Sequence, residues 1–232
     1  MAASPTRKPR ASKPRKPGSA KPRPRAPGRP AGETGDLRAA LLDAATTCFV
    51  RQGIASTSLR AIATEAGVTP AMLHYYFGDK AQLQQALVEE RILPALAPLA
   101  ADLAGMGEDI AALVAGFVGG IGRIVAAQPW LPALWVREVL CEGGALREVL
   151  FDRVGPLLPR MMAGRFAAAQ AKGRINPELD PRLLMVSLVG LTLFPAAGAP
   201  IWRRLFDADD LDYERLRRHT LALLDRGLEL DA

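Results

Sequence analysis

Apolar residues recur at helical spacing along most of this chain, and no segment of any length alternates apolar and polar residues as a half-buried strand does. The first such stripe runs from Leu37 to Phe49, and Gly53 is a typical residue just past a helix end. Further helices are expected near 79–104, 108–127, 130–141, 144–172, 181–195 and 211–229. The pattern predicts an all-α protein with a small N-terminal unit and a larger C-terminal one.

The charge of the chain is unevenly distributed. Residues 1–35 contain ten basic side chains, eight prolines and one acid, Glu33, so this tail carries +9 although the whole chain carries +6. With almost no large apolar side chain, the tail cannot bury enough surface to offset its ordering entropy, and we expect it to be disordered. It also lacks the apolar stretch of a secretory signal. Two interpretations stay open for it, namely non-specific contact with DNA and a purely solubilising role.

The composition argues against several function classes. Two histidines and two widely separated cysteines, Cys48 and Cys141, supply neither a zinc site nor a disulfide framework, so we expect no metal and no cofactor. Two free thiols fit a reducing cytoplasm. No nucleophile or acid–base constellation is visible, and we predict that the protein is not an enzyme.

Two uncharged stretches need a separate interpretation. Residues 183–202 are long enough to cross a bilayer, but Pro195 and Pro200 interrupt them, so we interpret them as a buried or subunit-interface helix and expect no membrane partner. The glycine-rich run 116–122 lacks the residue order of a nucleotide-binding loop and no strand precedes it. We interpret these glycines as points of close helix packing.

Two short helices joined by a tight turn are predicted near the N-terminus. The first begins after Thr57 or Ser58, either of which can cap it, and ends before Gly67. The second begins at Thr69-Pro70, a capping residue followed by proline at the first helical position. Such a pair is a helix-turn-helix unit, whose second helix fits a DNA major groove about 12 Å wide.

The motif residues of this region resemble the TetR family of bacterial transcription regulators. The matching pattern is Leu41-x-x-Ala44-Ala45-x-x-x-Phe49-x-x-x-Gly53, then Leu59-x-x-Ile62-Ala63-x-x-Ala66-Gly67-Val68, then Leu73-His74-Tyr75-Tyr76-Phe77-x-x-Lys80-x-x-Leu83. One departure is His74, where the family most often has tyrosine. The resemblance implies a helix-turn-helix domain at 36–92, preceded by the tail 1–35 and followed by a helical ligand-binding and dimerisation domain at 93–232.

The resemblance also implies DNA-binding roles by position. The expected phosphate contacts are Thr57, Thr69, His74, Tyr76 and Lys80; the expected groove-facing residues are Arg60, Ala71, Met72 and Tyr75; and Ser58 and Pro70 open the two helices. Two alternatives stay open, because Tyr76 is also a candidate core residue and Arg60 an ordinary solvated one.

In this family the C-terminal domain usually encloses a small-molecule cavity and supplies the dimer interface. Suitable apolar and charged residues for such a cavity are Phe117, Trp130, Leu134, Trp135, Arg137, Glu138, Phe151, Met161, Met162 and Phe166, although each also fits a plain core. For the homodimer we favour the helices near 181–195 and 211–229, the second of which carries Leu216, Leu223, Leu224 and Leu228.

The function expected from the resemblance is a ligand-responsive dimeric repressor that binds a palindromic operator in double-stranded DNA. The alternative is a DNA-binding regulator without a small-molecule effector, controlled by a protein partner or by its abundance. A closed cavity of several hundred Å³ in the C-terminal domain favours the first hypothesis, and a filled core favours the second.

Overall fold

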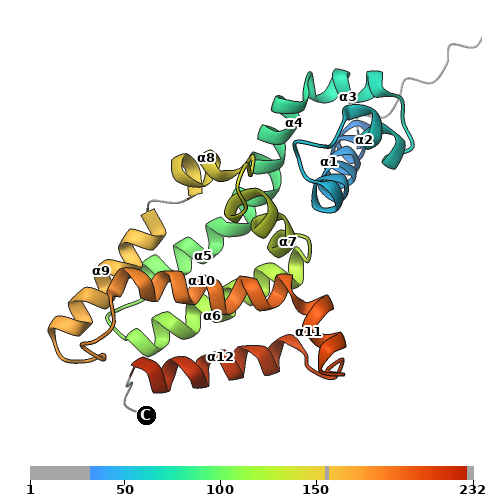
Figure 1. The fold of residues 1–232 in the computed structure, drawn as a ribbon. Coiled ribbons are helices and arrows are strands. Elements are labelled where there is room, and N and C mark those ends of the chain that lie inside the picture. The colour runs from blue at the N-terminus through green and yellow to red at the C-terminus, as the bar shows by residue number, and fades with distance from the viewer. Residues whose placement is uncertain (1–31, 155–156, 229–232) are drawn as a thin grey trace, which may run out of the picture.

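The computed structural model describes residues 32–154 and 157–228 (Figure 1). Over these ranges the chain forms helices, turns and loops with no strand, which confirms the predicted all-α class. Nearly all of the basic tail, residues 1–31, lies outside the described residues.

Four helices form the N-terminal unit: α1 (Gly32–Gln52), α2 (Leu59–Glu65), α3 (Pro70–Phe77) and α4 (Lys80–Leu87). Side-chain caps determine where α2 and α4 begin. The Ser58 hydroxyl accepts from the Ala61 amide, and the Asp79 carboxylate accepts from the Gln82 amide. The predicted stripe of α1 is buried against α2, and Cys48 lies in it at 0% exposure. Burial raises the pKa of the Cys48 thiol, so it packs as a small apolar group.

A continuous helical path joins the two units. From α4 the chain passes through a π-helical turn, η1 (Val88–Ile92), directly into α5 (Leu93–Gly105). This path lies where the sequence predicted a single helix near 79–104. No loop separates α4 from α5 in this part of the described chain.

The C-terminal unit consists of α6 (Ile110–Ala127), α7 (Leu131–Trp135), η2 (Val136–Leu140), α8 (Arg147–Val149), η3 (Leu150–Val154), α9 (Leu157–Ala171), α10 (Pro181–Ala197), α11 (Ala199–Leu205) and α12 (Tyr213–Leu228). Two expectations need correction. The helix predicted at 144–172 begins instead at Arg147, where α8 leads into the π-helical turn η3, and α9 begins at Leu157, after residues 155–156, which lie outside the described residues. The short helix α11 was not predicted, and Pro200 near its start is the signal for it.

The helix α6 is the centre of the C-terminal unit, with α5, α9, α10 and α12 packed around it. Its glycines permit close packing, as predicted. A side chain at Gly122 would overlap the ring of Tyr213, whose hydroxyl donates to the Val118 carbonyl at 2.7 Å. Length and hydropathy alone would let α6 cross a membrane, but nine of its residues are buried inside this bundle. The stretch 183–202 is bent by 70° between α10 and α11.

Candidate nucleic-acid interface

The turn between α2 and α3 has the geometry that the glycine predicted. Gly67 has a positive φ of 65°, a conformation that glycine adopts without steric cost. The Val68 amide donates to the Ala63 carbonyl at 2.9 Å and closes the turn. Leu73 and Phe77 of α3 are buried against the other helices of the unit, at 0% and 4% exposure. These contacts fix the angle at which α3 is held.

The opposite side of α3 faces solvent. Pro70, Ala71, His74 and Tyr75 are exposed, and Tyr75 has 80% of its surface accessible although tyrosine is usually at least partly buried. An aromatic ring that is exposed to this extent is available to contact a ligand. This face has the size and chemistry to enter a major groove and contact base edges.

Two other predicted residues of α3 are only half-exposed. Met72 and Tyr76 are of intermediate burial, and Tyr76 packs on the hydrophobic core and edge-on to Tyr75 at 5.2 Å between ring centroids. Both the phosphate and the core interpretations of Tyr76 therefore agree with its position. Its side chain also supports the exposed ring of Tyr75.

Other residues with a predicted role in DNA binding are exposed as well. They are Thr69 and His74, expected to contact phosphates, Arg60, expected to face the groove, and Ser58 at the start of α2. Thr69 makes no side-chain cap bond, so its hydroxyl is available. His74 Nδ1 lies 2.6 Å from the Gly78 carbonyl, which orients the ring at the end of α3.

The position of Thr57 differs from the expectation. Its side chain is 1% exposed, and its hydroxyl donates to the Gly53 carbonyl at 2.6 Å. A phosphate cannot reach a hydroxyl that is buried in this way. In this structure Thr57 stabilises the turn between α1 and α2, and the neighbouring Ser58 is the exposed residue.

Most of the basic side chains of the N-terminal unit are neutralised within the protein. Three salt bridges join helices of the unit to each other or to η1: Arg38–Glu90, Arg51–Glu65 and Arg91–Asp43. Among the described residues, Arg60 and Lys80 are the basic side chains of 36–92 without such a carboxylate partner. Lys80 donates to the Ala55 carbonyl at 2.7 Å. Arg60 lies in α2, and Lys80 is the first residue of α4, directly after α3.

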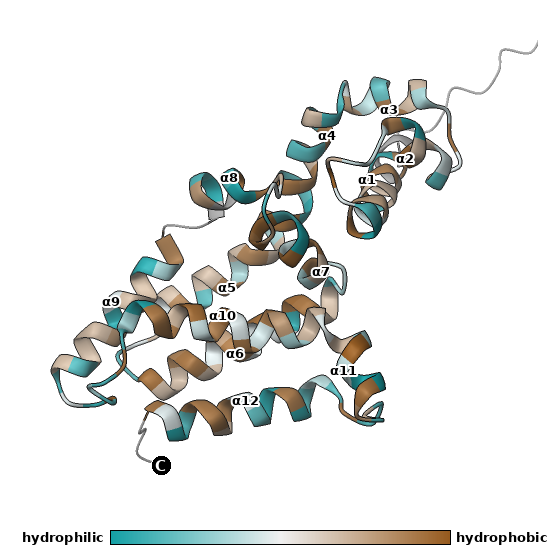
Figure 2. Ribbon diagram, in the orientation of Figure 1, coloured by the Kyte–Doolittle hydropathy of each residue, from teal (hydrophilic) through white to brown (hydrophobic). Residues whose placement is uncertain are grey.

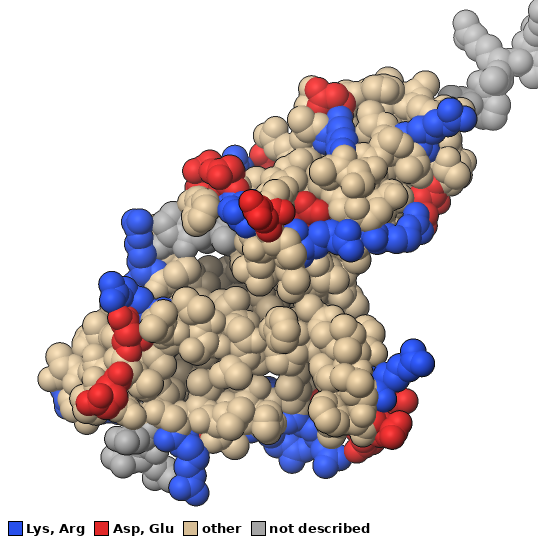
Figure 3. Space-filling view, viewed as in Figure 1, with Lys and Arg blue, Asp and Glu red and all other residues tan. Residues whose placement is uncertain are grey.

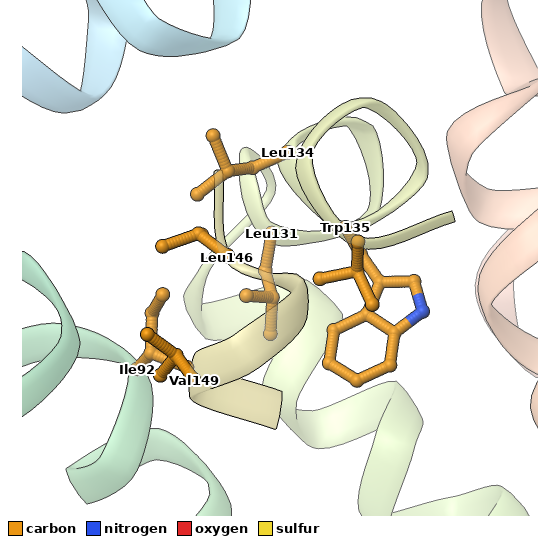
Figure 4. Close-up of a pocket in the computed structure, with 7 residues that line it drawn as sticks. Ile92, Leu131, Leu134, Trp135, Leu146 and Val149 are labelled. Atoms are coloured by element: carbon orange, nitrogen blue, oxygen red, sulfur yellow. The ribbon is translucent and has the colours of Figure 1, made fainter. Parts of the chain in front are cut away.

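A small apolar pocket lies where the two units meet (Figure 4). Its volume is about 20 Å³, little more than a single water molecule needs, and it is lined by Ile92, Leu131, Leu134, Trp135, Val139, Leu146 and Val149. Of the residues predicted to bind a ligand, the structure brings only Leu134 and Trp135 to this pocket.

The other predicted ligand residues are dispersed. Phe117, Met162 and Phe166 are core residues with exposures of 2% or less, whereas Phe151 is 60% exposed and Arg137 is also exposed. Trp130 and Met161 are half-buried, and Glu138 is buried and hydrogen-bonded to backbone amides. The lining residues that sequence reasoning missed come from three separate segments, and only their apolar character distinguished them in the sequence.

Comparisons with known proteins agree with this geometry. The family model described as "Bacterial regulatory proteins, tetR family" matches residues 41–87. The regulator TtgR of Pseudomonas putida is 40% identical over 57 residues, which are 25% of this chain and 27% of TtgR. The match therefore spans about a quarter of the length of that relative.

Solved structures extend the likeness to the C-terminal unit. NalD, the secondary repressor of the MexAB-OprM multidrug efflux pump in Pseudomonas aeruginosa, is 24% identical with a TM-score of 0.60, over 84% of this chain and 98% of NalD. FadR from Bacillus subtilis in complex with stearoyl-CoA is 19% identical with a TM-score of 0.61, over 82% and 98% of the two chains. Residues 41–87 therefore match the tetR family of bacterial regulatory proteins, and the described chain as a whole shares the fold of these two solved regulators.

Proposed function

We propose that the protein is a homodimeric repressor of transcription that inserts α3 of each subunit into the major groove of a two-fold symmetric operator. The observation that carries this proposal is the division of α3 into two faces. Leu73 and Phe77 fix the helix to the core, while Ala71, His74 and Tyr75 are exposed on a face that nothing in the described residues covers. Because its DNA partner lies in the bacterial cytoplasm, we place the protein there as a binding protein and not an enzyme.

The helix α10 supports a dimer. Leu183, Val186 and Phe194 are 61%, 65% and 68% exposed, and with Gly190 they recur at helical spacing on one face. A side chain at Gly190 would meet no atom within 4 Å, so this position leaves room for a second helix to approach. In Figure 3 the middle of the C-terminal unit is almost bare of charged side chains, which lie at its edges. Apolar surface of this kind is typical of an interface between subunits.

An open groove beside α10 extends the same surface. Leu191 and Pro195 of α10, Trp202 of α11, and Leu216 and Leu223 of α12 line much of it, and its volume is about 500 Å³. Figure 2 shows hydrophobic residues along α10 and α11 and alternating stripes on α12. The two predicted dimer helices therefore line one largely apolar groove, which Arg215 and His219 also border. Leu224 and Leu228 of α12 are instead buried within the subunit.

A two-fold dimer determines the form of the operator. Its two α3 helices would enter successive major grooves with centres about 34–36 Å apart, and each would read one half-site. The experiment that tests the proposal is selection of bound duplexes from a random-sequence pool by the purified full-length chain. We expect enrichment of two inverted half-sites at this separation. Recovery of unrelated duplexes without a shared sequence would contradict sequence-specific repression.

The size of the small apolar pocket favours control without a resident effector in the form described. A drug-sized ligand needs about 300–1,000 Å³, far more than the 20 Å³ available. A second candidate is supported by the apolar lining and by the indole nitrogen of Trp135, which is buried without a hydrogen-bond partner among the described atoms. In that case an apolar effector opens the pocket by separating η2 from α8.

Substitution of Trp135 tests the second candidate. If an effector opens this pocket, Trp135→Ala should leave the affinity for the selected duplex nearly unchanged while reducing effector-driven release, because Trp135 forms a wall of the pocket. The probes are a panel of apolar compounds that includes stearoyl-CoA, and the readouts are duplex release and quenching of tryptophan fluorescence. Tryptophan fluorescence that a probe quenches in the wild-type protein but not in Trp135→Phe would support binding of the probe in this pocket. The absence of release by every probe from the wild-type protein favours the regulator without an effector.

A further inference from the structure

Glu138 is a buried carboxylate that joins the two units of the protein. It lies on η2 in the C-terminal unit with 4% of its surface exposed. One carboxylate oxygen accepts from the Ile54 amide at 2.9 Å, and the other accepts from the Ala145 amide at 3.1 Å. Because Ile54 belongs to the turn between α1 and α2, a side chain of the C-terminal unit holds the backbone of the DNA-binding unit.

This contact is part of a longer chain of hydrogen bonds. Gln84 of α4 donates its side-chain amide to the Ala145 carbonyl at 3.0 Å, so the Ala145 backbone is bound through both its amide and its carbonyl. On the other side of the turn, Lys80 donates to the Ala55 carbonyl. The turn at 54–55 is therefore held between η2 and the first residue of α4, next to the proposed phosphate contacts.

The connection 141–146 lies close to η2, which places Ala145 beside Glu138. A side chain at Gly144 would collide with the backbone carbonyl of Glu138, so only glycine lets the connection pass this close to η2. The Leu146 amide donates to the same carbonyl at 3.0 Å. This close approach brings the Ala145 amide within reach of the Glu138 carboxylate.

The bonds of Glu138 contribute more to the orientation of the α1–α2 turn than to the free energy of folding. Burying a carboxylate costs free energy that its hydrogen bonds only partly offset, and an apolar side chain of similar volume fills such a site with less desolvation. A hydrogen bond, unlike an apolar contact, also requires a defined direction between donor and acceptor. The pair of bonds therefore restricts how the α1–α2 turn can rotate over η2.

We propose that Glu138 is a positioning residue for DNA binding, which fixes the angle between the N-terminal unit and the C-terminal unit. In the dimer this angle determines the separation of the two α3 helices. This inference rests on the proposed function. It also gives the small apolar pocket a route to the DNA-binding unit, because Trp135 and Val139 line the pocket on either side of Glu138 in the sequence, and Leu146 follows Ala145. Movement of η2 away from α8 alters the bond to Ile54.

The contact itself is tested by amide hydrogen exchange in the full chain. Glu138→Ala removes both acceptors and should speed exchange at Ile54 and Ala145. Glu138→Gln keeps the volume and one acceptor oxygen, so it should speed exchange at one of these two amides more than at the other. The matched control is Glu142→Ala, which removes an exposed carboxylate from the same connection. Unchanged exchange in a folded Glu138→Ala protein would overturn the proposal.

The positioning role is tested with two duplexes, namely the selected operator and the same operator with one base pair inserted between the half-sites. The insertion rotates one half-site by about 35° around the duplex axis. The wild-type protein should discriminate strongly between the duplexes. Glu138→Ala should bind the operator about tenfold more weakly, as for the loss of a hydrogen bond to a charged group, and its affinities for the two duplexes should approach each other. Base preference within a half-site should not change.

The variants separate a positioning role from loss of structure. Glu138→Gln should recover part of the discrimination, and Gln84→Ala, at the other end of the hydrogen-bond chain, should relax it without removing a buried carboxylate. If Glu138 has only a structural role, Glu138→Ala should weaken binding to both duplexes equally. An unchanged ratio of the two affinities would therefore refute the inference. If the wild-type protein selects no operator, the proposed function fails instead, and the exchange measurement still reports on the contact.

Discussion

Val186→Glu is expected to convert the protein to monomers and to weaken its affinity for the selected operator by about 10²–10⁴-fold, the range in which linking two binding units raises affinity. Val186 lies at the middle of the exposed stripe of α10, and a carboxylate there would lose its hydration against the apolar surface of a second subunit. Light scattering measures the mass of the particle, and fluorescence anisotropy measures the affinity for DNA.

The matched control for this variant is Leu157→Glu on α9. Leu157 is 85% exposed and receives the same change in charge, but it lies outside the surface formed by α10 and α12. We expect this control to remain dimeric with unchanged affinity. A dimer in the Val186→Glu protein would show that another surface joins the subunits.

Deletion of residues 1–35 is expected to weaken binding to random and selected duplexes by similar factors. The slope of log affinity against log salt should also flatten by about 0.9 for each phosphate that the tail no longer neutralises. The structure strengthens the reason for this prediction. Three of the five basic side chains in 36–92 are paired with carboxylates. The helix-turn-helix unit therefore offers little positive charge of its own, and the tail carries +9.

A salt titration of both proteins on both duplexes measures this effect. The informative control replaces the ten basic residues of the tail with glutamine, which keeps its length but removes its positive charge. This variant should behave like the deletion. Equal slopes for the full-length and shortened proteins would leave the tail with only a solubilising role.

The sequence predicted most of the local structure because local signals determine it. Ser58 and Asp79 cap helices by bonds to residues three positions away, and Gly67 supplies the positive φ of the turn. The same local signal did not distinguish Ser58 from Thr57, since either hydroxyl can cap a helix. Only the folded turn shows that Thr57 bonds to Gly53 and is buried.

Features that depend on distant contacts were not predictable in this way. The bond between Glu138 and Ile54 joins residues 84 positions apart, and the sequence offered Glu138 only as a possible ligand contact. The pocket lining likewise combines Ile92, residues of α7 and η2, and Leu146. Periodicity indicates which residues are apolar, but the relative placement of helices determines which of them meet.

We propose that the exposed face of α3 reads the DNA sequence, and a comparison of base preference in Tyr75→Ala and Lys80→Ala tests this. Both variants are placed on the selected operator and on every single-base change within one half-site, with the dimer verified by light scattering. Tyr75→Ala should change relative affinities by about 1–3 kcal/mol at one base position. Lys80→Ala should weaken all duplexes alike. If Lys80→Ala changes base preference more than Tyr75→Ala does, the assignment of α3 as the reading helix is contradicted.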